Sequence, residues 1–240
     1  IHKMTTRLSE QRQQLQADKV FLADSIADIS HQIRTPLTSI NLLVNFLADP
    51  DTDEEEQMRL LREMRELHVQ IEWLINSLLK MSKLDAGTIQ FKKETVSLLS
   101  LIQLAVEPIQ VAIDIRDQQL VVEAEGAFTG DTRWTAEAIT NISKNCMEHM
   151  EAGGVLTIQG SSNEIFTEIV ITDTGKGIDE EDLPNIFERF YKGKNSDPTS
   201  VGIGLALART IIISQNGTLK AENVPNGGAR FTMRFYKQIV

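Results

Sequence analysis

The sequence SHQIRTPLTSI, residues 30–40, places a histidine and a proline inside a stretch whose apolar residues have helical spacing. Two apolar series surround it, each with a period of seven residues and offset by four: Leu8, Leu15, Leu22 and Ile29, then Ile26, Ile33, Ile40 and Leu47. A repeat of this kind is typical of the a and d positions of packed helices. The pattern predicts one long helix over 3–47.

In this repeat, His31 falls at position f, which points away from the apolar seam. Thr35 follows one turn later on the same face, and Pro36 removes a backbone donor and so weakens the helix beneath the histidine. An exposed imidazole has a free ring nitrogen at pH 7 and can act as a nucleophile. The alternative is a histidine that is only solvated on the helix surface.

The segment ADPDTDEE, residues 48–55, ends this helix with Pro50 and a run of acidic residues. Helical spacing then resumes over 54–83, with apolar residues at Met58, Leu61, Met64, Leu67, Ile71, Leu74, Leu78 and Met81. Together the segments predict a helical hairpin, and two copies would bury their seams as a four-helix bundle in a homodimer. The alternative is an antiparallel pair that packs on another domain of its own chain.

Beyond residue 83 the pattern changes to shorter helices alternating with strands. We predict helices over 97–116 (bent at Pro108), 132–150 and 201–214, and strands over 119–125, 153–162, 164–175, 217–224 and 227–236, with a short strand in the linker 83–97. Such an order predicts an α+β layer, with helices on one face of a single sheet. The fold class is therefore multidomain, α followed by α+β: signalling helix 1–24, hairpin domain 25–86, linker 87–94 and an α/β sandwich 95–240.

The composition limits the partners of the chain. Its 240 residues carry a formal net charge of −10, which argues against nucleic acid, because sequence-independent binding of nucleic acid needs a basic face. One cysteine, Cys146, excludes an internal disulfide and is typical of a reducing cytosol. The chain begins at Ile1 rather than at methionine, so we expect a membrane or sensor segment upstream of it.

Two glycine-containing stretches are candidate ligand sites. In ITDTGKGI, residues 171–178, a predicted strand ends at Asp173 and is followed by Gly175 and Gly177, which allow the backbone to approach a ligand closely. In SVGIGLALART, residues 200–210, Gly202 and Gly204 lead directly into a helix whose N-terminus suits phosphate. Taken alone, the first is equally well an ordinary turn and the second an ordinary helix start.

Two further stretches supply polar groups. In NISKNCMEH, Asn141 and Asn145 share a helix face, and an amide oxygen together with phosphate oxygens and water can complete the coordination of Mg²⁺. In LPNIFERFYKGKNSDPTSVG, residues 183–202, the composition is that of a lid, and Arg189, Lys192 and Lys194 bring positive charge to the predicted phosphate site. Asparagines on a helix are commonly only solvated, so neither stretch identifies a function alone.

The order of these stretches resembles the cytoplasmic core of a two-component sensor histidine kinase. SHQIRTPLTSI resembles the H-box, NISKNCMEH the N-box, DTGKGI the G1 box, IFERFYKGKN the F-box and GIGLALA the G2 box, and NGGARF the final glycine motif. The likeness extends from about residue 20 to the C-terminus. It implies a dimerisation and histidine-phosphotransfer hairpin followed by a Bergerat-type ATP-binding domain.

The resemblance also implies roles for single residues. His31 matches the phosphoacceptor, Thr35 the polar residue associated with dephosphorylation of the partner, Asn145 the Mg²⁺ ligand, and Asp173 the carboxylate that accepts from the adenine amino group. The remaining expected ATP contacts are Asn141, His149, Gly175, Gly177, Arg189, Lys192, Gly202, Gly204 and Leu205.

Four positions depart from the family pattern. Gln32 follows the histidine where the family usually has Glu or Asp, so a carboxylate that would orient the ring and stabilise its charge is replaced by an amide. In the N-box, Cys146 stands where alanine is common, Glu148 where a basic residue is common, and His149 where an aromatic residue is common. We therefore expect slower phosphotransfer and assign Glu148 no role in binding phosphate.

The expected function is autophosphorylation of a histidine from Mg²⁺·ATP, with Gln32 beside the reacting ring, and transfer of the phosphoryl group to an aspartate of a response regulator receiver domain. The expected location is the cytoplasmic portion of a bacterial inner-membrane sensor. Two alternatives stay open, and both keep the ATP-binding fold. One is a mainly phosphatase or scaffold protein, which Gln32 and Glu148 favour, and the other is a plain Bergerat ATPase without phosphohistidine.

Overall fold

The structure is a computed structural model that describes residues 27–49, 52–194, 196, 200–225 and 227–237. The chain divides into two compact units, Ile1–Asn76 and Ser77–Val240. The first contains the predicted helical hairpin, and the second contains the predicted sheet with its helices. The predicted signalling helix at 1–24 lies outside the described residues.

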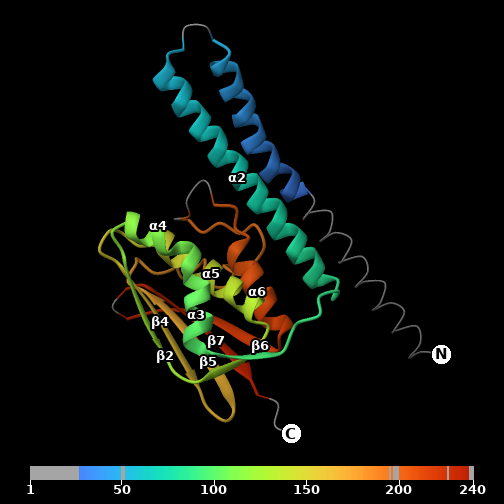
Figure 1. Cartoon of the computed structure of the whole chain (residues 1–240), viewed down its shortest axis with the longest axis vertical. Coiled ribbons are helices and arrows are strands. Elements are labelled where there is room, and N and C mark those ends of the chain that lie inside the picture. Colours follow the sequence, from blue (N-terminus) through green and yellow to red (C-terminus); the bar gives the residue numbers. More distant parts are fainter. Residues whose placement is uncertain (1–26, 50–51, 195, 197–199, 226, 238–240) are drawn as a thin grey trace, which may run out of the picture. The chain divides into compact units, whose positions relative to one another are not determined.

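The hairpin consists of two helices (Figure 1). Helix α1 is described over 27–47, and α2 spans Glu54–Asp85, so that it begins in the first unit and its last residues belong to the second. Asp53 caps the start of α2, because its carboxylate accepts a hydrogen bond from the backbone N–H of Glu56 at 2.8 Å. The acidic first turn of α2 also suits the positive end of the helix dipole. Pro36 lies within α1, which continues past it as a helix.

The hairpin buries only part of its apolar surface within one chain. Leu43, Leu60 and Leu74 are buried between the helices. Large apolar side chains of this unit that stay exposed are Leu37, Leu42, Val44, Phe46, Met58, Leu61, Val69 and Ile75. Met58 and Leu61 belong to the predicted seam, so one chain by itself does not cover that seam. An apolar surface of this extent is typical of an interaction face.

The second unit is built on a five-stranded sheet in the order β2-β4-β5-β7-β6. The strands are β2 (Gln119–Ala124), β4 (Val155–Ser162), β5 (Phe166–Asp173), β6 (Gly217–Asn223) and β7 (Ala229–Tyr236). β2 and β4 are parallel, and the other neighbouring pairs are antiparallel. A separate two-stranded ribbon pairs β1 (Glu94–Ser97) with β3 (Ala127–Gly130).

Helices cover one face of the large sheet (Figure 1), namely α3 (Leu98–Val106), α5 (Thr132–His149) and α6 (Gly204–Ser214). Along β5 every second residue is buried, so Ile169, Ile171 and Asp173 face the same way as one another. Asp173 is therefore the last residue of the inward-facing row. The alternation carries a carboxylate to the edge of the core, where β5 ends.

One stretch of the described chain, Leu98–Ile115, is long and apolar enough to cross a membrane by length and composition alone. In the structure it is not one helix, because a 3₁₀ turn at Glu107–Ile109 separates α3 from α4 (Gln110–Ile115). Pro108 lies in that turn, as the predicted bend requires. Leu101 and Ile102 are fully buried, so α3 belongs to the core of the second unit.

The predicted fold class is confirmed for the helical hairpin and for the α/β sandwich. The short strand predicted in the linker is present as β1. Its partner β3 was not predicted, because AFTG is only four residues long and carries one large apolar side chain, Phe128. The dimeric bundle stays a prediction.

We expect Phe128→Ala to destabilise the second unit by about 3–5 kcal/mol, the usual cost of removing a buried aromatic side chain. Phe128 is fully buried and packs edge-to-face on Phe235, with ring centroids 5.0 Å apart. The free energy of unfolding in urea is the measurement, and Ile115→Ala is the control because Ile115 is 80% exposed. Equal effects of the two substitutions would contradict this packing.

Candidate functional site

His31 lies on the exposed face of α1, as the heptad position predicts. Thr35 is also exposed, and its hydroxyl donates to the backbone carbonyl of His31 at 3.2 Å. Gln32 is half-buried beside the histidine. The first unit therefore presents an imidazole to solvent with a hydroxyl one helical turn away. The other predicted site residues all belong to the second unit.

Asp173 is the most constrained of the predicted residues. Asp173 is only 3% exposed, and its Oδ1 accepts hydrogen bonds from the backbone N–H groups of Gly175 at 2.8 Å and Ala229 at 3.2 Å. These two bonds fix the plane of the carboxylate and leave Oδ2 to other donors. A buried carboxylate of fixed orientation can read a single donor on a ligand.

Cys146 of α5 is buried against the same carboxylate. Burial, and then the negative charge of Asp173, raise the pKa of the Cys146 thiol well above its ordinary value of 9.0. A thiol in this environment stays protonated, so it can donate to the carboxylate and does not act as a nucleophile. The departure from alanine at this position therefore adds a weak donor next to Asp173.

Glycines allow the backbone to pack closely around Asp173. A Cβ on Gly175 would lie 2.7 Å from the carbonyl oxygen of His149, the last residue of α5. Gly228 has φ +89, and a Cβ there would lie 1.9 Å from the carbonyl oxygen of Asp173. Neither position accepts a side chain without movement of the backbone. The loop 174–178 and Gly228 are thus both held against the end of β5.

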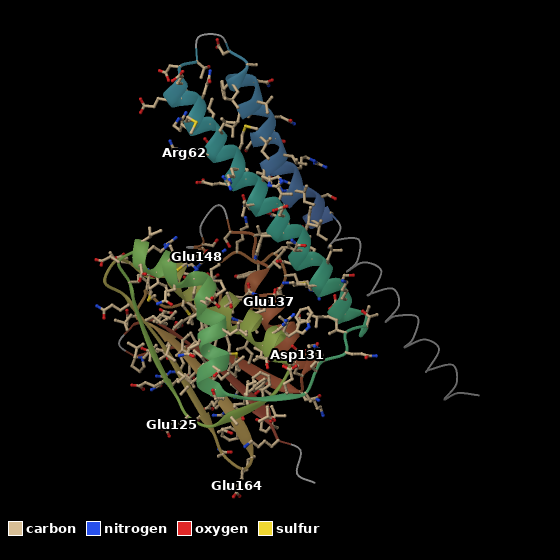
Figure 2. The ribbon with its side chains drawn as sticks, in the orientation of Figure 1. Arg62, Glu125, Asp131, Glu137, Glu148 and Glu164 are labelled. Carbon is tan, nitrogen blue, oxygen red and sulfur yellow. The ribbon has the colours of Figure 1, made fainter. Side chains whose placement is uncertain are left out.

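α5 carries the predicted polar face. It begins at the N-cap Asp131 (Figure 2), whose carboxylate accepts from the backbone N–H of Trp134 at 3.1 Å and of Lys92 at 2.9 Å. Asn141 and Asn145 are half-buried and four residues apart on the helix, and His149 is exposed one turn further on. The three side chains therefore follow one side of α5 towards the end of β5.

The start of α6 lies beside this face. A Cβ on Gly204 would lie 3.5 Å from Oδ1 of Asn141, so the first residue of α6 packs against the predicted polar row. No side chain caps α6, whose first turn contains Gly204 and the half-buried Leu205. Backbone N–H groups at such a helix start suit phosphate oxygens.

The basic residues of the F-box stretch do not all face open solvent. Arg189 forms an ion pair with Asp85 at 2.7 Å, in the last turn of α2, while Lys192 is exposed. Glu148, which we expected to disfavour phosphate, pairs with Lys144 at 3.7 Å (Glu148 is labelled in Figure 2). The acid at this N-box position is thus neutralised by its own helix.

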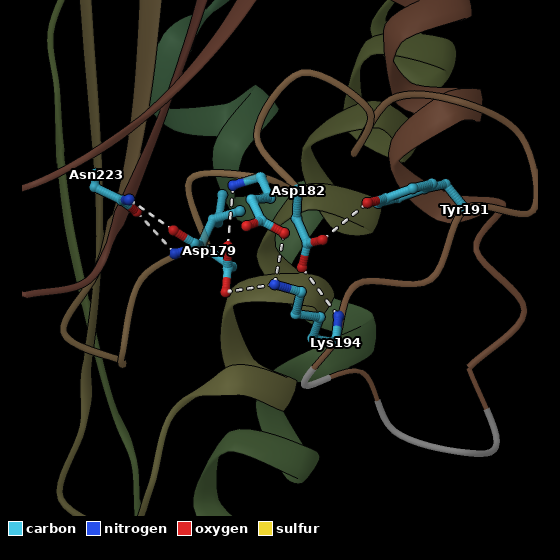
Figure 3. Close-up of polar contacts among 7 residues, drawn as sticks. Asp179, Asp182, Tyr191, Lys194 and Asn223 are labelled. Carbon is cyan, nitrogen blue, oxygen red and sulfur yellow. Dashed lines mark hydrogen bonds and ion pairs between the residues drawn. The ribbon is translucent and has the colours of Figure 1, made fainter.

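A polar cluster, the Asp182 cluster, holds the start of the lid segment (Figure 3). The buried Asp182 accepts from the Tyr191 hydroxyl at 2.8 Å and from the backbone N–H of Lys194 at 3.0 Å. The Lys194 ammonium lies 2.7 Å from Glu181 and 3.6 Å from Asp179. Lys194 is therefore engaged by two carboxylates, which leaves Lys192 as the better candidate for a ligand phosphate.

Three residues of this region were not predicted from the sequence. Ala229 acts through its backbone N–H, Gly228 through the absence of a side chain, and Asn223 through an amide that contacts the loop after Asp173. The motif NGGARF marked the place of the first two but not their contact with Asp173. For Asn223 the only available signal was its position at the end of a predicted strand.

Two family models match the chain. Residues 22–87 match the His Kinase A (phospho-acceptor) domain, and residues 130–239 match the histidine kinase-, DNA gyrase B-, and HSP90-like ATPase. Together the matches contain His31 in the first domain and Asp173 in the second.

Curated relatives include a heme sensor protein, HssS, of Staphylococcus saprophyticus, 31% identical over 213 residues, which are 88% of this chain and 46% of that protein. The sensor protein SphS of Synechococcus elongatus is 32% identical over 221 residues, 85% of this chain and 52% of that protein. The chain thus spans about half the length of these relatives.

Among solved structures, the fold resembles the Acinetobacter baumannii histidine kinase AdeS, with a TM-score of 0.70 at 20% identity over 86% of this chain and 97% of that chain. It also resembles the histidine kinase ThkA, solved in complex with the response regulator protein TrrA. That likeness has a TM-score of 0.67 at 20% identity and covers 90% of this chain and 61% of the other.

We expect Tyr191→Phe to raise the pKa of the Asp182 carboxyl. The Tyr191 hydroxyl, followed by the Lys194 backbone N–H, lowers this pKa from its ordinary 3.8. A lowered folded-state pKa adds stability that is complete above about pH 4 and is lost as the pH falls through the depressed value. The variant should therefore be less stable than the wild type near pH 7, and the difference should shrink in acid.

Carboxyl titration by NMR and unfolding in urea at several pH values test this expectation. Tyr236→Phe is the matched control, because Tyr236 is exposed at the end of β7. An Asp182 titration that is unchanged by Tyr191→Phe would show that the hydroxyl does not hold this carboxylate in solution.

Proposed function

This chain is the catalytic core of a sensor histidine kinase, with a phosphoacceptor domain and an ATP-binding domain, and we propose that it phosphorylates His31 from ATP. The phosphoryl group then passes to an aspartate of a response regulator. The observation that carries the proposal is the carboxylate of Asp173, buried and tied by Gly175 and Ala229 within the ATPase domain. An exposed histidine in the other domain supplies the acceptor.

The adenine of ATP binds at Asp173 in this proposal. Oδ1 of Asp173 already accepts two backbone hydrogen bonds, so Oδ2 is the oxygen that accepts from the exocyclic amino group. Gly175 and Gly177 give the ring close access to the backbone, and His149 packs at its side. A nucleobase without a donor at that position would form no hydrogen bond to Oδ2 of Asp173 and would bind more weakly.

The phosphates lie between α5 and the start of α6. The backbone N–H groups near Gly204 and Leu205, with Gly202 before them, face the phosphate oxygens, and Lys192 adds a positive charge. Asn141, which touches Gly204, lines this position from α5. Arg189 contributes to the phosphate site when its ion pair with Asp85 opens.

A magnesium ion fits the donors of this site. Asn145 offers one amide oxygen, and the described residues contain no group of three or more His, Cys, Asp or Glu side chains that could hold a metal ion. A site with a single neutral protein ligand suits Mg²⁺, which keeps several waters and binds phosphate oxygens. When bound, the ion neutralises charge on the polyphosphate.

The chemistry is an in-line displacement at the γ-phosphorus. A ring nitrogen of His31 forms the new N–P bond while the bond to the bridging oxygen of ADP breaks, and ADP leaves with the electron pair. Gln32 orients the ring through its amide but cannot accept a proton usefully. Transfer of the phosphoryl group to an aspartate carboxylate of a receiver domain restores the neutral imidazole.

The assembly we propose is a homodimer through the hairpin. Its support is the row of exposed apolar side chains on α1 and α2, among them Leu42, Phe46 and Leu61, which a second copy would cover in a four-helix bundle. ThkA in complex with TrrA supports a response regulator as the second partner. The membrane location proposed for the full-length protein rests on the relatives that are named as sensor proteins.

A second activity, dephosphorylation of the regulator, is favoured by one observation. Thr35 presents a hydroxyl one turn from His31 on the exposed face of α1, where it can orient water against a phosphoaspartate. Loss of regulator phosphate in the presence of a His31→Ala variant, and its retention with Thr35→Ala, would identify this activity. A plain ATPase would instead release phosphate steadily and form no phosphohistidine.

We expect His31→Ala to abolish acid-labile, base-stable label from γ-labelled ATP while nucleotide binding persists, because the acceptor and the nucleotide site belong to different units. His68→Ala is the matched control, since His68 is a second exposed histidine of the hairpin. Label that remains in His31→Ala would reject His31 as the acceptor.

Asp173→Asn should weaken nucleotide binding by about 1–3 kcal/mol, the usual cost of a lost charged hydrogen bond.

We expect Gln32→Glu to accelerate phosphorylation at saturating ATP, because a carboxylate beside the ring stabilises the positive charge that develops as the nitrogen attacks. Acid–base assistance is worth roughly 10²–10⁴-fold when fully engaged, so even part of it is measurable. The same carboxylate also favours the protonated ring, which is not a nucleophile. The gain should therefore be largest above about pH 7.5.

Single-turnover labelling from about pH 6 to 9 measures this effect. Asn45→Asp is the control, because it adds the same charge to an exposed position of the same helix. Nucleotide affinity should not change in either variant. Equal rates for wild type and Gln32→Glu above pH 8 would show that the amide already meets the requirement at this position.

A further inference from the structure

Asn223, the last residue of β6, makes a two-point contact with the loop that follows Asp173 (Figure 3). Its Oδ1 accepts from the backbone N–H of Ile178 at 2.7 Å, and its Nδ2 donates to the backbone carbonyl of the same residue at 2.7 Å. Both backbone groups of Ile178 are therefore satisfied by one side chain. The amide thus makes the two hydrogen bonds that the backbone of a neighbouring strand would otherwise make.

Besides Asn223, the loop is held by a hydrogen bond of 2.9 Å from the backbone N–H of Val155 to the Thr174 hydroxyl and by an exposed ion pair of Lys176 with Glu151 at 2.9 Å. Residues 174–179 form neither helix nor strand, and Gly177 within them adopts φ +77. A Cβ on Gly177 would lie 2.8 Å from Oδ1 of Asn223 and 3.3 Å from the carbonyl oxygen of Gly228. The loop thus lies close against the amide, with no room for a side chain between them.

Asn223 also belongs to the turn that orients Asp173. That turn connects β6 to β7, and its other end supplies Gly228, which packs on the carbonyl of Asp173, and Ala229, whose N–H binds the Asp173 carboxylate. One turn therefore holds the nucleotide loop at two points: at Asp173 through the backbone, and at Ile178 through a side chain. The second point is the only one that a substitution can remove without changing the backbone.

We propose that Asn223 is a positioning residue for nucleotide binding, which fixes the segment Gly175–Ile178 so that Asp173 and the glycines stay arranged for the adenine. This inference rests on the proposed nucleotide site. Asn223 touches the loop and not the ligand in this scheme, so its role is indirect. The backbone pairing of β6 with β7, from Gly217↔Phe235 to Asn223↔Ala229, holds the sheet without the amide.

Asn223→Ala and Asn163→Ala form a matched pair for the test. Asn163 lies in the turn between β4 and β5, at the opposite end of β5 from Asp173, and its Oδ1 accepts from the backbone N–H groups of Ile165 and Phe166 at 2.8 Å each. Each variant thus removes an exposed asparagine that satisfies two backbone groups of a loop. Only one of these loops is part of the nucleotide site.

We expect Asn223→Ala to raise the Kd of ADP roughly 3- to 10-fold by calorimetry, as the loss of one or two exposed hydrogen bonds implies. In labelling assays KM for ATP should rise while kcat stays near that of the wild type. Asn163→Ala should change neither, although the two variants should lower the melting temperature of the ligand-free protein similarly. An unchanged Kd in Asn223→Ala, or an equal rise in both variants, would overturn the role.

A double-mutant cycle with Gly177→Ala adds a readout that general loss of stability does not move. The added Cβ would press on Oδ1 of Asn223, so its effect on Kd should be smaller when Asn223 is already alanine. Additive effects would overturn the contact between loop and amide. Failure of the wild type to bind ADP would instead reject the proposed nucleotide site, and with it the premise of this inference.

Discussion

The buried carboxylate of Asp173 constrains how the loops and helix ends around it pack in the second unit. It stands at the end of the inward-facing row of β5, where neighbouring positions are filled by isoleucine, and it is only 3% exposed. A buried charge is costly unless it is hydrogen-bonded. Gly175 and Ala229 supply those bonds: Gly175 lies just after β5 in the chain, and Ala229 is the first residue of the neighbouring strand β7.

Several features of the sequence follow from that constraint. Gly228 must lack a side chain because its backbone packs on the carbonyl of Asp173, and Gly175 because it packs on the end of α5 at His149. The start of α6 also lies close to Asn141, although a Cβ on Gly204 would be in ordinary van der Waals contact there, at 3.5 Å. Loop, strand and helix ends therefore converge through backbone contacts, which suits phosphoryl transfer, a reaction that depends mainly on positioning and charge neutralisation.

Much of this arrangement could be predicted from periodicity. The heptad pattern placed His31 on the exposed face of α1, and the glycines that follow the predicted strand placed Asp173 at a loop. The exposed apolar side chains of the hairpin are also those that the proposed dimer would leave exposed on a single copy.

The remaining features depend on contacts that no local pattern encodes. Ala229 contributes only a backbone N–H, which every residue except proline has, and Asn223 acts 45 positions away from the loop that it holds. Arg189 was expected at phosphate, and its ion pair with Asp85 spans 104 positions. Charge and composition indicated that a basic residue would be near, but the partner of each charge is decided by tertiary packing.

The departures from the family pattern at Glu148, Cys146 and Gln32 differ in what the fold does with them. Glu148 is paired with Lys144 on its own helix, and Cys146 is a protonated thiol against Asp173, so both are accommodated within the second unit. Gln32 has no such compensation, because it stands directly beside His31 and an amide cannot take the place of a carboxylate when positive charge develops on the ring. We therefore expect the rate of phosphorylation to depend on a residue of the hairpin, whereas nucleotide affinity should depend on the loops around Asp173.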